Sequence, residues 1–333
     1  MHKGVIAPDF AAAHVLSENP WRYVELFLKR KGSNDALSFW KQARRFAEAN
    51  EYAAVEASPL LIYYSLLNAS KALLCDKGIL HSDSHGVAGD RPLAARAALV
   101  NEQVNFKSGG VLPSLCAYFR ESAVSETYNL KEILRNIPFV HRAFVLTFRS
   151  EKELFVPLER AMYVKHDKTR EAWFEAEIMP RFAHHQTIKS FPSSFTTYKS
   201  DGKIILARRK RFRYCAHGDT KAERAEALER LKTYHSSLRR VIVNISGNRD
   251  LWYLKKMDEG NSPGSRHTMT LMFAAMHRLS ELARYDPNGL DRHLSGQANW
   301  LLAEFIENSL NQFIDHIASE ITGLQFWPPK MRT

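Results

Sequence analysis

The sequence of 333 residues lacks most of the motifs that identify common enzyme classes. Its three cysteines, Cys75, Cys116 and Cys215, lie far apart and form no CxxC pair, so neither a disulfide framework nor a zinc ribbon is indicated. It contains no Walker motif and no GxGxxG after an expected strand. Its one GxSxG string, GNSPG at residues 260–264, lies in an expected loop and not at a strand-to-helix turn. The sequence therefore gives no support to an NTPase, a dinucleotide-binding enzyme or an α/β-hydrolase, and we predict no cofactor.

Long hydrophobic runs are also missing. The longest apolar stretch, residues 60–75, is interrupted by Ser, Asn and Lys. It therefore falls short of the roughly 18 consecutive apolar residues that a membrane-spanning helix needs. The first residues, MHKGVIAPDFAAAHVLSENP, lack a secretory hydrophobic region followed by a cleavage site. We predict a cytoplasmic protein without a membrane partner.

Histidines occur in two small groups that could be considered for metal binding. One group is His81, Asp83 and His85, and the other is the His184-His185 pair with His166. Neither group has a third well-spaced ligand or the HExxH or cysteine context that identifies a zinc site. Loop histidines are the simpler interpretation, and we predict no metal.

Positive charge is abundant, with 47 Lys and Arg against 36 Asp and Glu, which gives a net charge of +11. Such an excess favours a polyanionic partner, RNA or DNA. The alternative is that the charge indicates no such partner, because many bacterial cytoplasmic proteins are basic without binding nucleic acid.

The order of patterns along the chain predicts an α+β fold. Helical signals begin near Pro20, Asn34 and Ser58, where N-cap residues or proline precede apolar residues at helical spacing. Short β-branched and aromatic runs, from AFVLTF to KIILARRKRFRYC, follow, with a hairpin signal at Ser200-Asp201-Gly202. Helical periodicity returns after Asp219. We predict a mainly helical bundle with an inserted β-rich lobe, divided into residues 1–142, 143–217 and 218–333.

The segment from Ser58 to Leu80 predicts a central helix. Its apolar residues cover so wide an arc that the helix should be buried in a bundle. On the remaining narrow face Tyr64, Asn68, Lys71 and Cys75 follow one another at steps of four, three and four residues. This polar line is either a solvent edge or part of a groove that binds an anion or a nucleotide edge.

Two family resemblances rest on this helix. The stretch YYSLLNASKALLCDKGI, followed by SHGV with His85 and Gly86, resembles the pattern of the HEPN superfamily over about residues 35–145. The longer arrangement, up to ARYDP near the carboxyl end, is similar to the YaaC-like family of bacterial proteins. The HEPN resemblance implies a helical bundle, homodimerisation and, in many members, a metal-independent RNase with toxin or antiphage roles.

The HEPN resemblance also implies a catalytic arginine and histidine separated by four to six residues. Four pairs fit this spacing: Arg135 with His141, Arg160 with His166, Arg211 with His217 and Arg230 with His235. The first is favoured by its place along the chain and by Asn136, which follows the arginine as in many HEPN motifs. A histidine can move the 2′-hydroxyl proton while an arginine stabilises charge on phosphate. Pro138 lies between them, however, and would interrupt a helix that carried both side chains.

The stretch ARRKRFRY predicts a nucleic-acid-binding strand. It contains five basic residues and an adjacent aromatic residue: Arg208, Arg209, Lys210, Arg211, Phe212 and Arg213. Basic side chains contact phosphates and aromatic rings stack on bases. The alternative is an edge strand that its charges protect from aggregation.

We expect an RNA-binding protein of bacterial stress or antiphage defence, and the HEPN resemblance implies an endoribonuclease activity. The second hypothesis is a non-catalytic module that docks a partner protein from the same operon.

Overall fold

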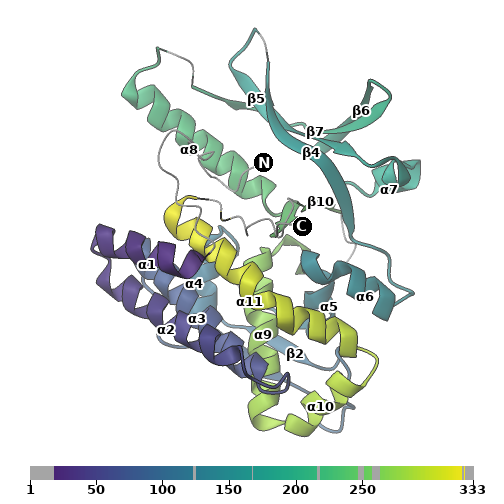
Figure 1. The fold of residues 1–333 in the computed structure, drawn as a ribbon. Coiled ribbons are helices and arrows are strands. Elements are labelled where there is room, and N and C mark those ends of the chain that lie inside the picture. The colour runs from purple at the N-terminus through teal and green to yellow at the C-terminus, as the bar shows by residue number, and fades with distance from the viewer. Residues whose placement is uncertain are drawn as a thin grey trace, which may run out of the picture. The chain divides into compact units, whose positions relative to one another are not determined.

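The computed structural model describes residues 19–122, 125–166, 168–215, 218–246, 251–256, 263–324 and 326. They form two compact units: a helical unit from Val5–Lys152 and Asn261–Thr333, and a sheet unit from Glu153–Gly260 (Figure 1). The predicted mixture of helices with antiparallel strands is confirmed. The relation of the helical unit to HEPN bundles stays a prediction.

The helical unit contains helices from both segments of the chain and a small sheet. The sheet is antiparallel, with the order β1-β2-β3. Its elements are α1 (Pro20–Lys31), α2 (Asn34–Asn50), α3 (Ser58–Asp76), β1 (Val87–Asp90), β2 (Gln103–Phe106), α4 (Val111–Tyr118), β3 (Thr127–Asn129), α5 (Leu130–Arg135), η1 (Pro138–Val140), α6 (His141–Thr147), η3 (Pro263–Ser265), α9 (Thr268–Tyr285), α10 (Pro287–Ser295) and α11 (Asn299–Thr322).

Helix boundaries follow the capping signals in the sequence. The side chain of Asn19 accepts hydrogen bonds from the first turn of α1, and Gly32 ends that helix in the left-handed conformation. Asn129 and Glu132 form a capping box at α5. The chain leaves this helix before Pro138, as predicted, because the residue before a proline is pushed out of helical geometry.

Helix α3 lies in the middle of the helical unit, as its wide apolar arc predicts. It packs against α2, α4, α9 and α11. Tyr63, Leu66, Ala69 and Leu73 are all inaccessible to solvent. The apolar core of the unit therefore forms around this helix.

A buried carboxylate, Glu102, connects distant parts of the helical unit. It is fully buried, and its Oε1 accepts hydrogen bonds from Arg91 Nε and His293 Nε2, both at 2.7 Å. Its Oε2 accepts one from Arg278 Nη2, also at 2.7 Å. These hydrogen bonds and charges outweigh the cost of burial and lower the pKa of Glu102 to about 2.

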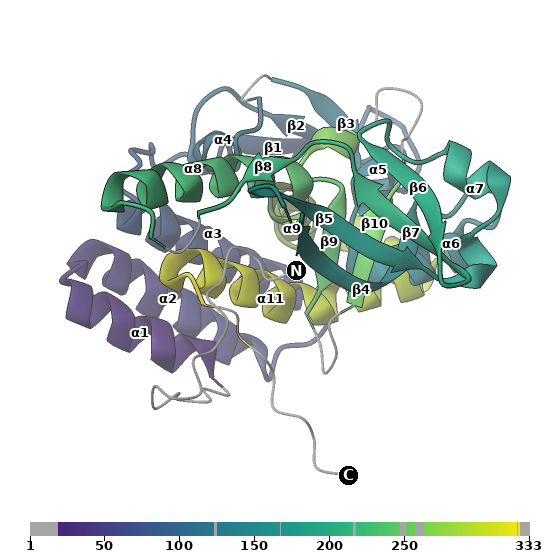
Figure 2. The same cartoon turned by 90° about the horizontal axis from the view of Figure 1, so that it is seen from above.

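The sheet unit is an antiparallel sheet with the strand order β6-β7-β5-β4-β10-β9, and the short β8 also pairs with β5 (Figure 2). Its elements are β4 (Phe155–Lys165), β5 (Glu171–Ile178), η2 (Pro180–Phe182), α7 (His185–Lys189), β6 (Phe195–Ser200), β7 (Lys203–Arg208), β8 (Phe212–Arg213), α8 (Lys221–Leu238), β9 (Ile242–Ile245) and β10 (Leu251–Lys255).

The hairpin signal at Ser200-Asp201-Gly202 is confirmed. Ser200 pairs with Lys203 across the turn between β6 and β7. Asp201 and Gly202 have positive φ angles of 49° and 74°. Two such residues match the twist of a two-residue hairpin turn, for which Asp-Gly is strongly preferred.

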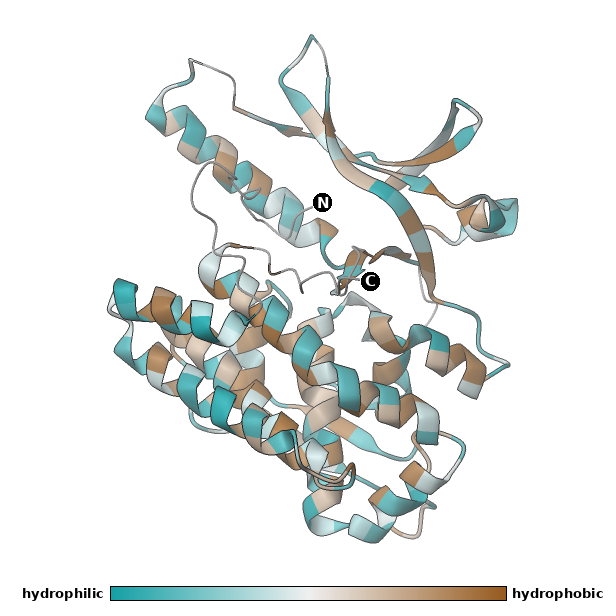
Figure 3. Ribbon diagram, viewed as in Figure 1, coloured by the Kyte–Doolittle hydropathy of each residue, from teal (hydrophilic) through white to brown (hydrophobic). Residues whose placement is uncertain are grey.

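One face of the large sheet packs against helix α8. Alternate residues of β5 are buried, as expected for a sheet with one covered face. The end of α8 contributes Tyr234 and Leu238 to the same core as Phe174 and Leu206. The rest of α8 is mostly hydrophilic (Figure 3). The amphipathic contact with the sheet is therefore confined to its second half.

The boundaries between the two compact units lie at 152/153 and 260/261, whereas the predicted boundaries were 142/143 and 217/218. Helix α8 and strands β9 and β10 belong to the sheet unit, because their apolar residues complete its core. The AFVLTF run, expected to be a strand, instead contributes to α6 of the helical unit. An apolar run of this length suits a strand or a buried helix equally, so periodicity alone cannot distinguish them.

Candidate functional site

The predicted basic strand is interrupted by a bulge. β7 pairs Ala207 with Glu175 of β5, and β8 pairs Phe212 with Ala172. Between these pairs the basic segment advances by five residues while β5 advances by three. The extra residues cannot continue the ladder, so they leave the sheet. The single continuous strand expected from the sequence is therefore interrupted after Arg208, which still pairs with Phe195 of β6.

Arg208, the last residue of β7, points inward. It follows the buried Leu206 by two residues and so lies on the same face of the strand. This arginine is 7% exposed, and its guanidinium stacks 4.4 Å from the Tyr234 ring centroid. Its Nη1 donates to the Tyr234 carbonyl at 3.0 Å and its Nη2 to Ser237 Oγ at 2.8 Å. Arg208 thus connects β7 to α8. Because its guanidinium is buried there, it does not belong to the predicted nucleic-acid-binding surface.

The other basic residues of the segment are exposed. Arg209 Nε donates to the Phe195 carbonyl at 3.0 Å. Arg211 pairs with Glu171 at 2.7 Å and stacks 4.5 Å from the Trp173 ring centroid. Within the described residues, Lys210 and Arg213 form no ion pair. These two side chains are therefore the best placed to neutralise an external anion.

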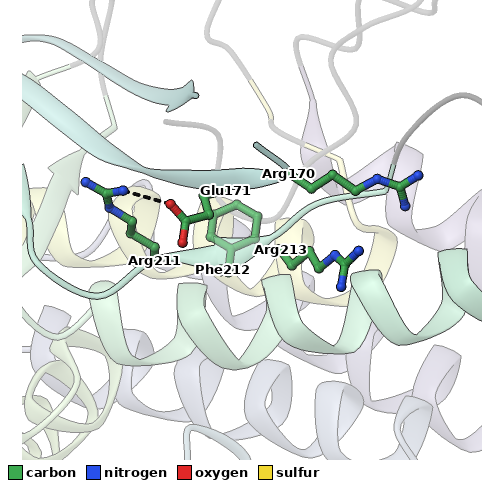
Figure 4. A pocket seen from close by; sticks show the side chains of 5 residues that line it. All are labelled: Arg170, Glu171, Arg211, Phe212 and Arg213. Atoms are coloured by element: carbon green, nitrogen blue, oxygen red, sulfur yellow. Dashed lines mark hydrogen bonds and ion pairs between the residues drawn. The ribbon is translucent and has the colours of Figure 1, made fainter. Parts of the chain in front are cut away.

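A surface cavity of about 310 Å³ lies at the bulge, lined by Arg170, Glu171, Arg211, Phe212 and Arg213. Figure 4 shows Arg170 and Arg213 extending to one side, while Arg211 reaches Glu171 on the other. Phe212 packs 4.7 Å from Tyr234, measured between ring centroids, and is only half-exposed. Arg170 Nη1 in turn pairs with Asp219 Oδ1 at 2.8 Å. Arg213 is therefore the lining arginine without an ion pair among the described residues.

Sequence patterns alone did not identify three residues of this surface, Arg170, Glu171 and Trp173. They come from β5 and the turn before it, and only strand pairing brings them to the bulge.

Most of the chain's net positive charge lies in the sheet unit. Residues 153–260 contain 22 Lys and Arg and 14 Asp and Glu, a net +8 of the chain's +11.

Arg135 and His141 lie on different elements, α5 and α6, separated by η1 at Pro138. Arg135 Nε lies 3.8 Å from Glu151 Oε2. His141 is 6% exposed, and its Nδ1 lies 2.6 Å from the carbonyl oxygen of Pro138. The ring thus packs at the start of α6, a position that does not favour proton transfer with an external substrate.

This placement predicts different effects for the two alanine variants. His141→Ala should lower the free energy of unfolding by roughly 1–3 kcal/mol, because it removes a buried ring. Arg135→Ala should change it by less than about 1 kcal/mol, because its ion pair is long and partly exposed. Denaturant unfolding measures both effects. A loss of RNA cleavage in both variants, with folding unchanged, would instead support the HEPN catalytic assignment.

The predicted polar line of α3 is divided in the structure. Asn68 is buried, and its side-chain amide donates to the Tyr64 carbonyl at 2.8 Å, a contact within the helix. Tyr64 stacks on Phe46 with ring centroids 5.3 Å apart. Lys71 Nζ lies 3.3 Å from Asp83 Oδ1. Asn68 therefore serves the helix itself, whereas the side chains of Tyr64 and Lys71 are partly exposed to solvent.

His85 lies beside α3 and meets a second histidine that the sequence did not single out. His277 of α9 is buried, and its ring centroid lies 5.5 Å from that of His85 and 4.9 Å from that of Tyr63. Burial, His85 and Arg284 lower the pKa of His277 to about 3. Burial, with Arg284 and Lys71, also lowers the pKa of His85. Both rings are therefore neutral near pH 7.

Two features are absent from the residues that the structure describes. No group of three or more His, Cys, Asp or Glu side chains in this part of the chain is arranged to hold a metal ion. No helix that the structure describes is long and apolar enough to cross a membrane.

Comparison with known proteins gives one match. No curated protein and no solved structure matches the chain. Residues 11–321 match the family model described as YaaC-like Protein, as the sequence resemblance predicts. The match spans nearly the whole chain and both structural units, and the protein therefore belongs to the YaaC-like family.

Proposed function

We propose that this protein binds RNA through the bulge surface of the sheet unit, defined as Arg170, Lys210, Arg211 and Arg213. The observation that carries the proposal is that Lys210 in the bulge and Arg213 in β8 are exposed and have no carboxylate partner among the described residues. The surrounding unit has a net charge of +8, which attracts a polyanion over a longer range.

The expected mode of binding is contact with the phosphate backbone. Arginine and lysine side chains neutralise phosphates without reading the base sequence. The aromatic side chains offer little stacking surface, because Arg211 covers Trp173 and Phe212 packs on Tyr234. We therefore expect weak sequence preference and a strong dependence of affinity on salt.

The test compares two double variants with the same change in net charge. Lys210→Glu with Arg213→Glu changes the bulge, whereas Lys189→Glu with Lys199→Glu changes exposed lysines of α7 and β6. Fluorescence anisotropy with single-stranded RNA should show at least about a tenfold loss for the bulge variant. Its salt slope should fall by roughly 1.4, about 0.7 for each lost phosphate contact. The control variant should keep most of the affinity.

Two results would contradict the proposal. Equal losses in both double variants would mean that binding follows net charge and not the bulge. A wild-type protein that binds neither RNA nor single-stranded DNA would exclude the function and leave the protein-docking hypothesis.

RNA cleavage and a role in defence stay predictions of the HEPN resemblance. The placement of His141 gives them no further support, so the proposed function is binding alone.

A further inference from the structure

A second cavity, in the helical unit, has the features of a small-molecule site. Its volume is about 360 Å³, within the range of ligand pockets. It lies among the loop before β2, the start of α5, the end of α6 and the turn from α10 to α11. The side chains that the argument uses are Arg96, Lys131, Phe148, Arg292 and His293.

His293 is held in place by a buried carboxylate. The ring is 4% exposed, and its Nε2 lies 2.7 Å from Oε1 of the fully buried Glu102. Because Glu102 is ionised, it accepts the hydrogen on Nε2 and fixes the orientation of the ring. His293 also lines the cavity, and Nδ1 is the ring nitrogen that the contact with Glu102 leaves available for a hydrogen bond.

The charges that line this cavity are not balanced. Lys131 is neutralised by Glu151, whose Oε1 lies 2.6 Å from its Nζ, and it also covers the Phe148 ring at 4.6 Å. Arg96 and Arg292 are exposed, and neither forms an ion pair with another described residue. Two positive charges therefore remain at the cavity without a counter-charge from this part of the chain.

We propose that this cavity binds a phosphate monoester of metabolite size, with Arg96 and Arg292 on the phosphoryl group and the Glu102-oriented His293 hydrogen-bonded to the ligand. A phosphate monoester carries a charge of about −1.5 to −2 near neutral pH, which matches the two unpaired arginines. Arginine also presents its donors in the fork geometry that suits phosphate oxygens. The site is independent of the RNA-binding surface in the sheet unit.

Isothermal titration of the full chain tests the site with ribose 5-phosphate, AMP and adenosine. We expect binding of the two phosphate monoesters and at least about a tenfold weaker binding of adenosine. Arg96→Gln with Arg292→Gln should weaken AMP binding at least about tenfold, because both phosphate contacts are lost. Arg22→Gln with Arg30→Gln, which removes the same charge from the exposed side of α1, should change the affinity less than about twofold.

Three results would overturn the proposal. The first is no binding of either phosphate monoester to the wild type. The second is an equal loss of AMP affinity in the two double variants, which would mean that binding depends on net charge and not on this cavity. The third is malate binding as tightly as ribose 5-phosphate, which would assign the cavity to dianions in general and not to phosphoryl groups.

Discussion

Replacing Glu102 by Gln is expected to lower the free energy of unfolding of the helical unit by about 3–5 kcal/mol. The carboxylate receives hydrogen bonds from Arg91, Arg278 and His293, and it is fully buried. A glutamine keeps the shape but removes the negative charge and turns one acceptor into a donor. Arg91 would then keep only Asp286 as a counter-charge, and Arg278 only Glu281. Removing one partner of a buried ion pair in this way is strongly destabilising.

Denaturant unfolding followed by circular dichroism measures this loss. The matched control is Glu48→Gln on α2, which removes a partly exposed ion pair with Arg44. Exposed pairs of this kind contribute less than about 1 kcal/mol. Similar unfolding midpoints for the two variants would show that the buried network does not stabilise the fold.

The same network predicts a dependence on pH. The pKa of Glu102 is about 2 in the folded protein against a usual value of 4.5, so the folded state binds this proton less readily than the unfolded state. Its contribution, about 3 kcal/mol, is therefore complete above pH 5 and is lost as the pH falls toward 2. The stability difference between the wild type and Glu102→Gln should shrink over this range. A difference that stays constant between pH 5 and 2 would contradict the shift.

Gly110→Ala is expected to destabilise the helical unit by about 2–5 kcal/mol. Gly110 has φ +121°, and an added Cβ would lie 2.5 Å from the Gly86 nitrogen and 2.7 Å from the Ser84 oxygen. These are backbone atoms, which cannot rotate away. The loop that carries His85 and the start of α4 would have to separate, together with the hydrogen bond from the Leu112 amide to the His85 carbonyl.

The neighbouring Gly109 provides the control. A Cβ at Gly109 meets no atom within 4 Å, and its φ is not positive. Gly109→Ala should therefore change the free energy of unfolding by less than about 0.5 kcal/mol. Thermal unfolding of both variants gives the comparison. If Gly110→Ala unfolds at the same temperature as Gly109→Ala, the two loops are not packed as closely as the structure shows.

The sequence could predict features that depend on neighbours along the chain. The wide apolar arc of α3 specifies its burial, because helical periodicity places those side chains around the axis whatever the helix packs against. The Ser-Asp-Gly turn specifies the β6–β7 hairpin, because few residues tolerate positive φ. The sequence shows that ARRKRFRY is basic, but it does not predict which of these arginines are exposed to solvent.

Only the tertiary structure decided which charged groups meet. Arg208 is buried because Tyr234 of α8, 26 residues further along the chain, covers it, whereas Arg213 in β8 is exposed. Such packing of a helix on a strand is a non-local property. Glu102, Arg278 and His293 are separated by up to 191 residues in the chain, so no local pattern relates them. The sequence alone determined the buried central helix, the β6–β7 hairpin and the positive charge, whereas the two candidate sites arise from contacts that form only when the chain folds.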